Sequence, residues 1–589
     1  MRMNRKAKTS LTLCLALSLA CLGMAGCSGE TEETDDTGSE ETAEEESAVD
    51  DATVVGSIEI VCDSEQLDAD VDDVKDWVFD FVYDEDSQAE VKASLDAAKD
   101  GQTLAEPLVE YNPFGTNAQS LYVYFTTDEA ASISYTVSVS DEEAASIEDE
   151  SFTSDSIADF TREVDDGESS TEHEFQVIGL IPNVVNTVTV TATYEDGSVE
   201  CCTISCDMCD ILGEEDLQLE VTEGDSDAEL EDGLYVILGN DSDDVDFMYY
   251  YDNDGILRGE VPIIGYRSHR LLFDDEGTMY YSCSQSRMAA MTTLGQIEHV
   301  YFLGDYDLHH DYVFDDDGNL LILATDTSQN ETVEDMVIKL DTETGDVELV
   351  VDMGDLLSSY KESALAYYEE NYDPEDGQTS EEGDDAGVDW MHLNSIQWMG
   401  DDSIILSSRE TSSIIKISNI STDPTIDYII ASEEYWEDTE YADLVLEQVG
   451  DFTIQGGQHC VVYVEDDSLE EGQYYLLLFN NNIGISSGVT SGFDYSSIGL
   501  TETTSRNEDA SSYYYKYLVD ENEGTFELVD SLAVTYSGYV GSVQEIGDNL
   551  IVNSGTSGSW TEYDEDHVAI RSFSMGTDKF IYRVFKYDL

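Results

Sequence analysis

The sequence predicts an all-β protein with two domains, an N-terminal β-sandwich followed by a β-propeller of roughly six blades. Three observations predict this fold class. The chain of 589 residues is too long for one compact core. Short runs of alternating or β-branched apolar residues recur along the chain, as in β-strands. Beyond the first third of the chain, acidic turns ending in glycine join such runs in pairs, which is typical of β-hairpins.

The N-terminus has the pattern of a bacterial lipoprotein signal peptide over residues 1–26. Basic MRMNRKAK precedes the apolar run TSLTLCLALSLACLGM, and small residues lead to Cys27. The apolar run is short for a membrane span, so cleavage before Cys27 and lipidation of its thiol are expected, with Cys21 as an alternative site. Residues 27–55 are mostly acidic and small, and we expect a disordered tether. The protein is therefore expected to be exported and lipid-anchored at the outer face of a bacterial membrane.

Residues 56–212 are predicted to form the β-sandwich. QSLYVYFTT, ASISYTVSVS, HEFQVIGL and NTVTVTATY show two-residue alternation or β-branched enrichment. Such runs favour a small antiparallel sandwich. The amphipathic stretch VKDWVFDFVYDEDSQAEVKASLDAAKD is expected to be partly helical.

Four cysteines lie within nine residues of this domain in the run CCTISCDMC, namely Cys201, Cys202, Cys206 and Cys209. In an exported protein, one or two local disulfides are the expectation. A zinc cluster is an alternative, although the spacing matches no standard ribbon or finger. Free buried thiols are the remaining alternative.

Residues 213–589 are predicted to form the β-propeller. An acidic connector comes first, and hairpin turns follow in YYDNDGILRG, LFDDEGTMYY, VFDDDGNLLIL, KLDTETGDVEL and LVDENEGTFELV. In each of them Asp closes a turn and Gly supplies a positive φ. About six blades of roughly 40–60 residues fit the remaining length. A large sandwich or a β-helix is the alternative architecture.

The charge of the chain excludes one class of partner. With 133 acidic and 22 basic residues, the formal net charge is -111. Such a chain cannot neutralise phosphates, so we expect no nucleic-acid partner. A solvated acidic surface is the expected meaning of the charge. Calcium bound at the Asp-rich turns is the alternative, but none of these turns has full EF-hand spacing.

Three histidines stand at the start of β-like runs in separate parts of the propeller. His310 lies in LHHDYVFDDDGNL, His392 in DWMHLNS and His459 in IQGGQHCVVYV. Because the innermost strand of each blade borders one central channel, residues from different blades can converge there. Arg409 in SSRETSS adds a fixed positive fork, and Asn394 adds an amide. These donors predict a pocket for a tetrahedral anion such as sulfate or phosphate.

Zinc is the rival interpretation of the same residues, since three histidines with Asp311 form a plausible ligand set. An arginine and an asparagine amide are poor neighbours for a cation. We therefore predict no metal at this site. The sequence also contains no Gly-x-x-x-x-Gly-Lys loop that would hold a nucleotide, and no cofactor is expected.

The motifs HHDYVFDDDGNLLIL, DWMHLNSIQWMGDDSIILSSRETSSIIKI and GGQHCVVYV resemble those of bacterial arylsulfate sulfotransferases, the kind independent of phosphoadenosine phosphosulfate. EYNPFGTNAQSLYVYFTT and EHEFQVIGLIPNVVNTVTVTAT resemble the sandwich domain of that family. The likeness covers about residues 56–589. It implies transfer of a sulfuryl group from an aryl sulfate donor to a phenolic acceptor, by a ping-pong mechanism through a sulfohistidine.

The resemblance also implies roles for individual residues. His459 would be the nucleophile. Four others would hold the sulfuryl oxygens, namely His310, His392, Asn394 and Arg409. His309 is adjacent to His310 and remains an alternative for its place.

Several alternatives stay open at this stage. A non-catalytic propeller that binds a ligand or a partner is the second functional hypothesis, and a zinc hydrolase is the third. The insert ESALAYYEENYDPEDGQTSEEGDDAGV is either an acidic lid or a simple loop. A homodimer is also open. Four tryptophans could line a phenol pocket, although core packing is favoured for them: Trp390, Trp398, Trp436 and Trp560.

Overall fold

The protein is described from a computed structural model. It describes residues 52–62, 74–75, 77–145, 147, 157–164, 167–213, 215–239, 246–329, 331–372, 387–577 and 579–589. The predicted signal peptide, Cys27 and nearly all of the predicted tether lie outside these residues, as does the insert from residue 373 to 386. No helix in the described ranges is long and apolar enough to cross a membrane.

The N-terminal domain is built on one seven-stranded sheet, in which strands follow the order β1-β7-β6-β3-β2 and β4 and β5 also pair with β3. The long strand β3 pairs with β2 and β5 over its first half and with β4 and β6 over its second half, so one strand serves two layers. The strands are β1 (Thr53–Val61), β2 (Leu108–Tyr111), β3 (Leu121–Ser138), β4 (Phe160–Glu163), β5 (Ser170–Val177), β6 (Val185–Tyr194) and β7 (Val199–Asp207).

The amphipathic stretch of this domain is helical, as expected. A π-helical turn (Val78–Val82) leads into α2 (Glu85–Ala98). The carboxylate of Asp84 caps α2 by accepting a hydrogen bond from the backbone N–H of Ser87. Val91 and Leu95 of the helix are buried against the domain.

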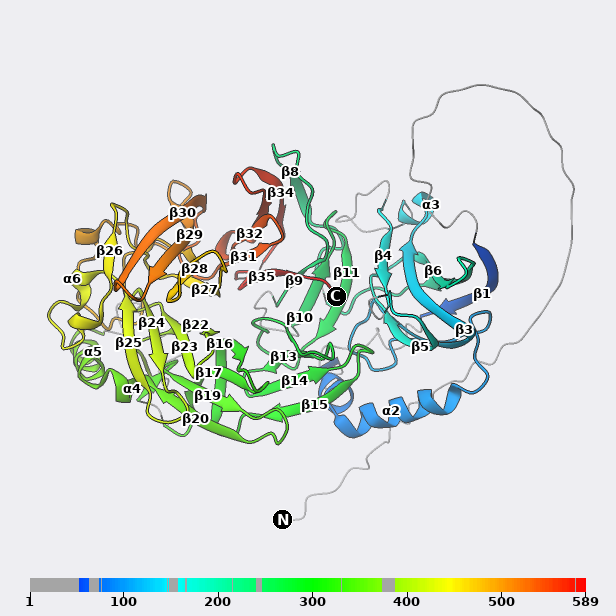
Figure 1. Cartoon of the computed structure of the whole chain (residues 1–589), viewed down its shortest axis with the longest axis horizontal. Helices are drawn as coiled ribbons and strands as arrows, with labels where there is room; N and C mark the ends of the chain where they lie inside the picture. Colours follow the sequence, from blue (N-terminus) through cyan, green and yellow to red (C-terminus); the bar gives the residue numbers. More distant parts are fainter. Residues whose placement is uncertain are drawn as a thin grey trace, which may run out of the picture. The chain divides into compact units, whose positions relative to one another are not determined.

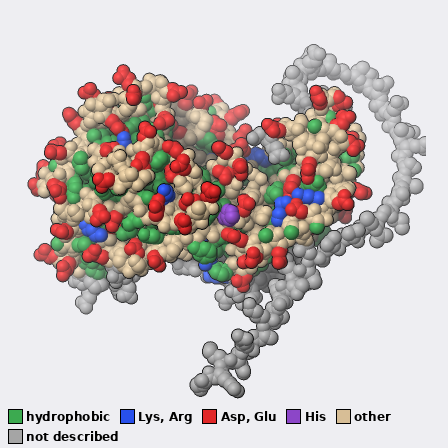
Figure 2. All heavy atoms as spheres, turned by 60° about the horizontal axis from the view of Figure 1, so that its bottom comes forward, with side chains coloured by type: hydrophobic (Ala, Val, Ile, Leu, Met, Phe, Trp, Pro, Cys, Tyr) green, Lys and Arg blue, Asp and Glu red, His purple; other side chains and the backbone are tan. Residues whose placement is uncertain are grey.

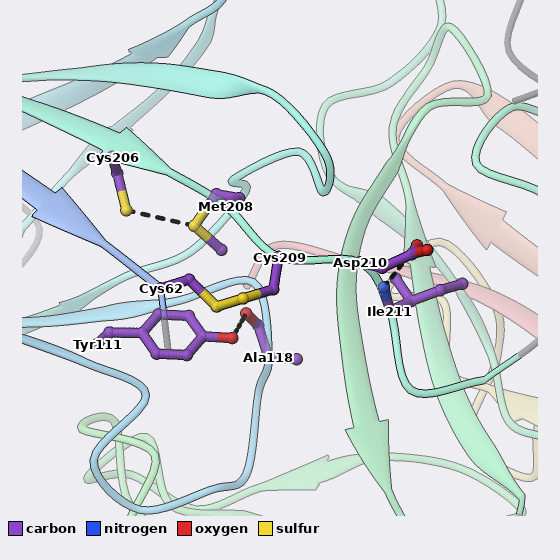
Figure 3. The surroundings of a disulfide bond; sticks show 8 residues. All are labelled: Cys62, Tyr111, Ala118, Cys206, Met208, Cys209, Asp210 and Ile211. Carbon is purple, nitrogen blue, oxygen red and sulfur yellow. Dashed lines mark hydrogen bonds between the residues drawn. A yellow bond between two sulfur atoms is a disulfide. The ribbon is translucent and has the colours of Figure 1, made fainter. Parts of the chain in front are cut away.

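The expectation of disulfides within CCTISCDMC is wrong. Cys209 instead pairs with Cys62, at the end of β1, and Figure 3 shows this bond beside Tyr111 and Met208. Cys201, Cys202 and Cys206 are free and buried. The reason is their place on one extended strand, β7, where neighbouring side chains point to opposite faces and distant ones are too far apart to be bridged.

Six further sheets form the blades of the propeller and surround a common centre (Figure 1). Four of them have four strands and two have five. Blade one contains β9 (Leu234–Ile237), β10 (Phe247–Tyr251), β11 (Leu257–Pro262) and β35 (Val584–Tyr587). Blade two contains β12 (Leu272–Phe273), β13 (Met279–Ser284), β14 (Arg287–Met291) and β15 (Ile297–Phe302). Blade three contains β16 (Tyr306–Phe314), β17 (Leu320–Asp326), β19 (Met336–Leu340) and β20 (Val347–Asp352).

The other three blades complete the ring. Blade four contains β22 (Leu393–Trp398), β23 (Ser403–Ser408), β24 (Ser413–Ser418) and β25 (Thr425–Ile430). Blade five contains β26 (Glu447–Val449), β27 (His459–Val464), β28 (Gln473–Asn480), β29 (Ser511–Asp520) and β30 (Thr525–Thr535). Blade six contains β31 (Ser542–Ile546), β32 (Asn549–Ser554), β33 (Ser559–Tyr563), β34 (Ala569–Ser574) and β8 (Glu220–Glu223).

Short elements link the blades. The parallel pair β18 (Thr332–Val333) and β21 (Val388–Asp389) joins blade three to blade four. The remaining helices are α3 (Asp141–Ala144), α4 (Met353–Leu356), α5 (Ser358–Asn371), α6 (Glu433–Trp436), and the 3₁₀ turns η6 (Ala442–Leu444), η7 (Tyr495–Ile498) and η8 (Gly555–Ser557). Helix α5 occupies the first part of the insert.

Both ends of the propeller chain close the ring. The last strand, β35, pairs with β9 and becomes the inner strand of the first blade. The first strand, β8, pairs with β34 and becomes the outer strand of the last blade. Strand pairing at both ends of the propeller chain therefore closes the ring.

The acidic turns are hairpins, as predicted. At the turn between β10 and β11, Oδ1 of Asp252 accepts hydrogen bonds from the backbone N–H groups of Asp254 and Ile256, and Gly255 has φ 73°. Asp315 makes the same two bonds in blade three. The aspartates therefore have a structural role in the turn. Figure 2 shows acidic side chains spread over the visible face of the molecule.

Three of these four tryptophans belong to the packed interior, as favoured above. Trp390, Trp436 and Trp560 are at most 1% exposed and lie within core clusters. Trp398 donates a hydrogen bond to Asp316.

Candidate active site

The inner strands of blades three, four and five carry the three predicted histidines. These strands, β16, β22 and β27, are consecutive neighbours around the centre (Figure 1). His310 lies within β16, His392 directly precedes β22, and His459 begins β27. The prediction that they come from separate blades and converge is confirmed.

Each inner strand is irregular at its histidine. The hydrogen-bond register shifts between Leu308 and Tyr312 in β16, and similar shifts follow His392 and His459. His310 and His392 have positive φ angles of 59° and 48°. Bulges and left-handed backbone at non-glycine residues re-aim side chains and concentrate at functional sites. The blades therefore turn these histidines toward the centre by local departures from regular strand geometry.

Arg409 and His392 form the middle of the site. Nη1 of Arg409 lies 2.9 Å from Nε2 of His392. On its other side, Nδ1 of His392 lies 2.5 Å from Oε2 of Glu334 and 2.6 Å from Oδ2 of Asp389. Arg409 is also held by carboxylates, with Nε 2.9 Å from Oε1 of Glu410 and Nη2 3.3 Å from Oδ2 of Asp389. Both side chains are therefore held by carboxylates that are buried or half-buried.

His310 joins this network through Glu334. Its Nε2 lies 3.1 Å from Oε2 of Glu334, and its ring centroid is 4.5 Å from that of His392. The neighbouring His309 is buried, with its ring centroid 5.2 Å from that of His310. Among the described residues, neither ring nitrogen of His309 has a hydrogen-bond partner. Of the two adjacent histidines, His310 is the one bonded into the site.

His459 has a defined tautomer. Nδ1 lies 2.8 Å from Oδ1 of Asn481 and 3.0 Å from the carbonyl oxygen of Gly457. The amide of Asn481 is oriented by its Nδ2 group, which donates to the carbonyl oxygens of Ser537 and Val540. Oδ1 therefore faces His459 and can only accept, so the proton resides on Nδ1. Nε2 keeps its lone pair, which accepts a hydrogen bond from the backbone N–H of Val540, 3.4 Å away.

Burial sets the charge of His459. It lowers the pKa of the imidazole to about 3, although the hydrogen bond with Asn481 opposes this, and the charges of Arg409 and His392 lower the pKa further. The ring is therefore neutral at physiological pH. A neutral imidazole whose proton is fixed on Nδ1 keeps its lone pair on Nε2 and is a competent nucleophile.

Asn394 binds the backbone next to His459. Its Nδ2 donates to the carbonyl oxygen of Gln458, 2.8 Å away, and its own backbone carbonyl accepts a hydrogen bond from Nη2 of Arg583. Gln458 in turn donates to the carbonyl oxygen of Ser408, which directly precedes Arg409. Asn394 therefore couples the segment that carries His459 to blade four. Its predicted contact with substrate stays a prediction.

The charge state of His392 makes the centre suited to an anion. Burial and Arg409 lower its pKa, but Glu334 and Asp389 outweigh them and raise it to about 10. A guanidinium can only donate. In neutral His392, the lone pair on Nε2 accepts from Nη1 of Arg409, 2.9 Å away, but in the imidazolium Nε2 carries a second proton and is itself a donor. Two donors would then point at one place. An oxyanion lying between Arg409 and His392 would accept from both.

Two groups of side chains have the spacing of metal ligands, His309 with His310 and Glu334, and Glu334 with Asp389 and His392. The ligand atoms in each group lie within 4.8 Å of one another. In the second group, Nδ1 of His392 faces two carboxylates and keeps its proton in either charge state, which leaves it no lone pair for a metal. The donors of this second group therefore fit an ion-pair network better than a metal centre.

Asp311 is not part of either metal-like group. Its carboxylate contacts two arginines, with Oδ1 2.8 Å from Nε of Arg270 and 2.9 Å from Nη1 of Arg583. Its Oδ2 also accepts a hydrogen bond from the backbone N–H of Ile396. The ligand set of three histidines with Asp311 is therefore not assembled in the structure.

Aromatic side chains lie beside the histidines. The ring of Tyr582 stacks on His310 at 5.6 Å between centroids, and its hydroxyl donates to the carbonyl oxygen of His310. The guanidinium of Arg267 lies 4.5 Å from the centroid of Tyr582 and 4.3 Å from that of Tyr266. Phe580 and Tyr539 pack edge to face at 5.5 Å, and Tyr539 directly precedes Val540. Aromatic surface thus borders the site from His310 to the residue beside His459.

Sequence reasoning missed three acids of the site. Asp389 and Glu410 directly flank motif residues, so their place in DWMHLNS and SSRETSS could have drawn attention to them. Glu334 lies in ETVEDMVIK, far from any histidine in the sequence. Only the folding of the β18–β19 segment against blade four brings it to His310 and His392. Asn481 was missed for the same reason.

Comparisons with known proteins give the family. No curated protein matches the chain. Solved structures with some likeness include a putative 6-phosphogluconolactonase from Bacteroides fragilis (11% identity, 79% of this chain and 99% of that chain, TM-score 0.32) and AztD from Citrobacter koseri (10%, 68% and 94%, 0.27). At such values these likenesses support no argument. The family model for the arylsulfotransferase Ig-like domain matches residues 108–208. The model for arylsulfotransferase (ASST) matches residues 220–584, more than half of the chain. The chain therefore belongs to the arylsulfotransferase family and is a transferase with aryl sulfotransferase activity.

Proposed function

We propose that the protein moves a sulfuryl group from an aryl sulfate ester to a phenol in two half-reactions, through a sulfohistidine on His459 and without phosphoadenosine phosphosulfate. The observation that best supports this proposal is the tautomer of His459. Asn481 and Gly457 hold the proton on Nδ1, so Nε2 presents its lone pair at the centre of the propeller. A binding module has no need of such an arrangement.

In the first half-reaction, the lone pair of Nε2 attacks the sulfur atom of the donor. The N–S bond forms, the S–O bond to the aryl group breaks, and its electron pair leaves on the phenolate oxygen. The ring keeps the proton on Nδ1, and the hydrogen bonds to Asn481 and Gly457 stabilise the positive charge that develops. In the second half-reaction, the oxygen of the acceptor phenol attacks the same sulfur atom. The N–S bond breaks, its electron pair returns to Nε2, and the phenolic proton is released to a base.

The sulfuryl oxygens need donors while charge builds on them. Arg409 and His392 converge on one place, where an oxygen would accept from both. The backbone N–H of Val540, 3.4 Å from Nε2, would meet another oxygen of the group carried there. Losing one such donor costs about 10²–10³ in rate in other enzymes.

The aromatic surface beside the histidines suits the aryl part of both substrates. Tyr582 stacks on His310, and Tyr539 packs against Phe580 and directly precedes Val540, whose N–H contacts His459. Aryl rings pack on such side chains in offset or edge-to-face geometry. We assign this region to the aryl group of the donor and of the acceptor.

We further propose that the mature chain is exported and held at a bacterial membrane through lipid on Cys27. The signal-like residues 1–26 and the acidic segment after them support this proposal. Globomycin treatment of expressing cells, with metabolic labelling by a tagged fatty acid, tests it. Label on the wild type that is absent from a Cys27→Ala variant is expected, and equal label on both would contradict it.

Steady-state kinetics with two substrates test the sequence of steps. With 4-nitrophenyl sulfate as donor and phenol as acceptor, double-reciprocal plots at several fixed acceptor concentrations should give parallel lines, with no added nucleotide. A His459→Ala variant should lose the transfer, whereas a His299→Ala control, at a side chain 55% exposed outside the site, should keep it. Intersecting lines would contradict the covalent route.

A further inference from the structure

Glu334 occupies an unusual position between two blades. It stands in the turn between β18 and β19, with a left-handed φ of 57° that is unfavourable for glutamate. Its backbone is held on both sides. The N–H donates to Oγ1 of Thr325 in blade three, and the carbonyl accepts from the N–H of Leu393 at the start of blade four. A strained backbone conformation that is held by hydrogen bonds on both sides is typical of a functional position.

The side chain of Glu334 bridges two blades by one oxygen. Oε2 lies 3.1 Å from Nε2 of His310 and 2.5 Å from Nδ1 of His392. The residue is 6% exposed. A carboxylate oxygen has two lone pairs, so it can accept a proton-bearing nitrogen from each ring. Glu334 therefore determines which nitrogen of each histidine is committed and which is left for other contacts.

The nitrogens left over are Nδ1 of His310 and Nε2 of His392. Nε2 of His392 is the atom that lies beside Arg409, where the sulfuryl oxygens are assigned. A carboxylate behind an imidazole fixes its tautomer and favours a proton on the far nitrogen during charge development. Glu334 therefore orients His392 from the nitrogen opposite the one that faces the assigned sulfuryl position.

We propose that Glu334 is a positioning residue for sulfuryl transfer, which holds His310 and His392 as a pair and keeps His392 a proton donor to the sulfuryl group. This inference rests on the proposed function. Glu334 itself touches neither the nucleophile nor, in this assignment, the substrate. No nucleotide, metal or further co-reactant is needed for its role.

Charged and titratable groups face His392 from every element around it. His309 and His310 come from β16, Glu334 from the turn before β19, Asp389 from β21, Arg409 from the turn after β23, and His459 from β27. Asp389 is the second acceptor at Nδ1. Removing the charge of Glu334 should therefore weaken, but not abolish, the preference of His392 for its protonated form.

The test is the first half-reaction alone, measured as the burst of 4-nitrophenolate released from 4-nitrophenyl sulfate without acceptor. The protein from residue 52 to residue 589 is mixed with donor in a stopped-flow instrument from pH 6 to 10. Three variants are compared: Glu334→Gln, Glu334→Asp and the control Glu331→Gln. Glu331 directly precedes β18, and its side chain is 71% exposed. Thermal unfolding of each variant checks the fold.

In Glu334→Gln, we expect the burst rate to fall on the order of 10²-fold, as when a preorganised donor is lost. Its alkaline limb should move to lower pH, because His392 loses its proton more easily with one carboxylate gone. Glu334→Asp should restore the pH profile toward that of the wild type, even with a slower burst, because it restores the charge. Glu331→Gln should match the wild type.

The outcomes separate this inference from the proposed function. A wild-type burst with equal rates and equal pH profiles in Glu334→Gln would overturn the role of Glu334 and leave the sulfohistidine route standing. A slower burst with an unchanged pH profile would also overturn it, because Glu334 would then only support the fold. No burst in the wild type would reject the proposed function itself. If Glu334→Gln does not fold, the burst rate of Glu334→Asp decides: a slower burst is expected, because the shorter side chain withdraws its oxygen from both rings while keeping the charge, and a wild-type burst rate would overturn the role of Glu334.

Discussion

At the scale of single residues, the proton on Nδ1 of His459 decides which nitrogen can react. Asn481 accepts that proton's hydrogen bond, and its own amide is fixed by two backbone carbonyls. In the proposed mechanism, the reactivity of Nε2 thus depends on Asn481, which contacts the other ring nitrogen. Similarly, Arg409 is oriented by Glu410 and Asp389.

The depressed pKa of His459 makes a stability prediction with a definite sign. An unfolded histidine binds a proton below pH of about 6.5, whereas burial lowers the folded pKa to about 3. Between these values the unfolded state binds more protons, so the free energy of unfolding falls as the pH falls below about 6.5. His459→Gln removes this contribution. At pH 5 it should lose about 2 kcal/mol less than the wild type does relative to pH 7.

Thermal unfolding of both proteins at pH 7 and pH 5 measures this difference. His567→Gln, at a side chain 22% exposed on a hairpin of blade six, is the control and should follow the wild type. Identical changes of the midpoint in wild type and His459→Gln would show that the folded imidazole is protonated at pH 5.

Arginine at position 409 is predicted to be irreplaceable by lysine. The planar fork contacts His392, Asp389 and Glu410 at once, and a lysine ammonium cannot reproduce these directions. Arg409→Lys should lower kcat/KM for 4-nitrophenyl sulfate on the order of 10²-fold. Arg506→Lys, at the surface, should leave it unchanged. Near-wild-type activity in Arg409→Lys would mean that only the charge matters.

At the scale of secondary-structure elements, regular strands position the site and irregular ones complete it. The strands and hairpins could be predicted from the sequence, because alternation and Asp–Gly turns are local signals. The convergence of His310, His392 and His459 was predicted by placing each at the start of a strand, which holds for His392 and His459 but not for His310, in the middle of β16. The register shifts in these strands and the positive φ angles of His310 and His392 had no local signal. Glu334 could not be found, because its contacts exist only between blades.

The disulfide shows the same limit at the level of elements. Four clustered cysteines indicated local bonds, but strand β7 points its side chains alternately to two faces. Cys209 lies beyond that strand and reaches Cys62 at the end of β1, 147 residues earlier. A bond across so long a loop restricts the unfolded chain by an amount on the order of 4–5 kcal/mol.

Removal of this bond should therefore destabilise the N-terminal domain. In the double variant Cys62→Ala/Cys209→Ala, the thermal midpoint of that domain should fall clearly, and added dithiothreitol should change it no further. The wild type should fall to the same level only when reduced. A midpoint equal to that of the oxidised wild type would show that the bond contributes nothing.

At the scale of the whole molecule, the site depends on ring closure. β35 supplies the inner strand of the first blade, and Tyr582 and Arg583, just before it, contact His310 and Asn394. The end of the chain therefore both closes the propeller and borders the site. Lys586 within β35 is also buried against Glu562 of blade six.

Truncation after Arg583 should open the ring. It removes β35, exposes the edge of β9, and should abolish cooperative unfolding together with sulfuryl transfer. Truncation after Tyr587, which removes only two residues beyond the strand, is the control and should keep both. Transfer activity in the shorter protein would show that the site needs no closed ring.

The whole molecule is strongly acidic, so it can bind an anionic group only at a local positive site. In a chain with net charge -111, we propose that the sulfuryl group is held by Arg409 and protonated His392, which neighbouring carboxylates fix in place. The most direct test is the intact mass of the protein without its N-terminal 51 residues, after mixing with 4-nitrophenyl sulfate and no acceptor. We predict a gain of one sulfuryl group on His459, absent in His459→Ala and discharged by added phenol. An unchanged mass, or an equal gain in His459→Ala, would contradict transfer through this histidine.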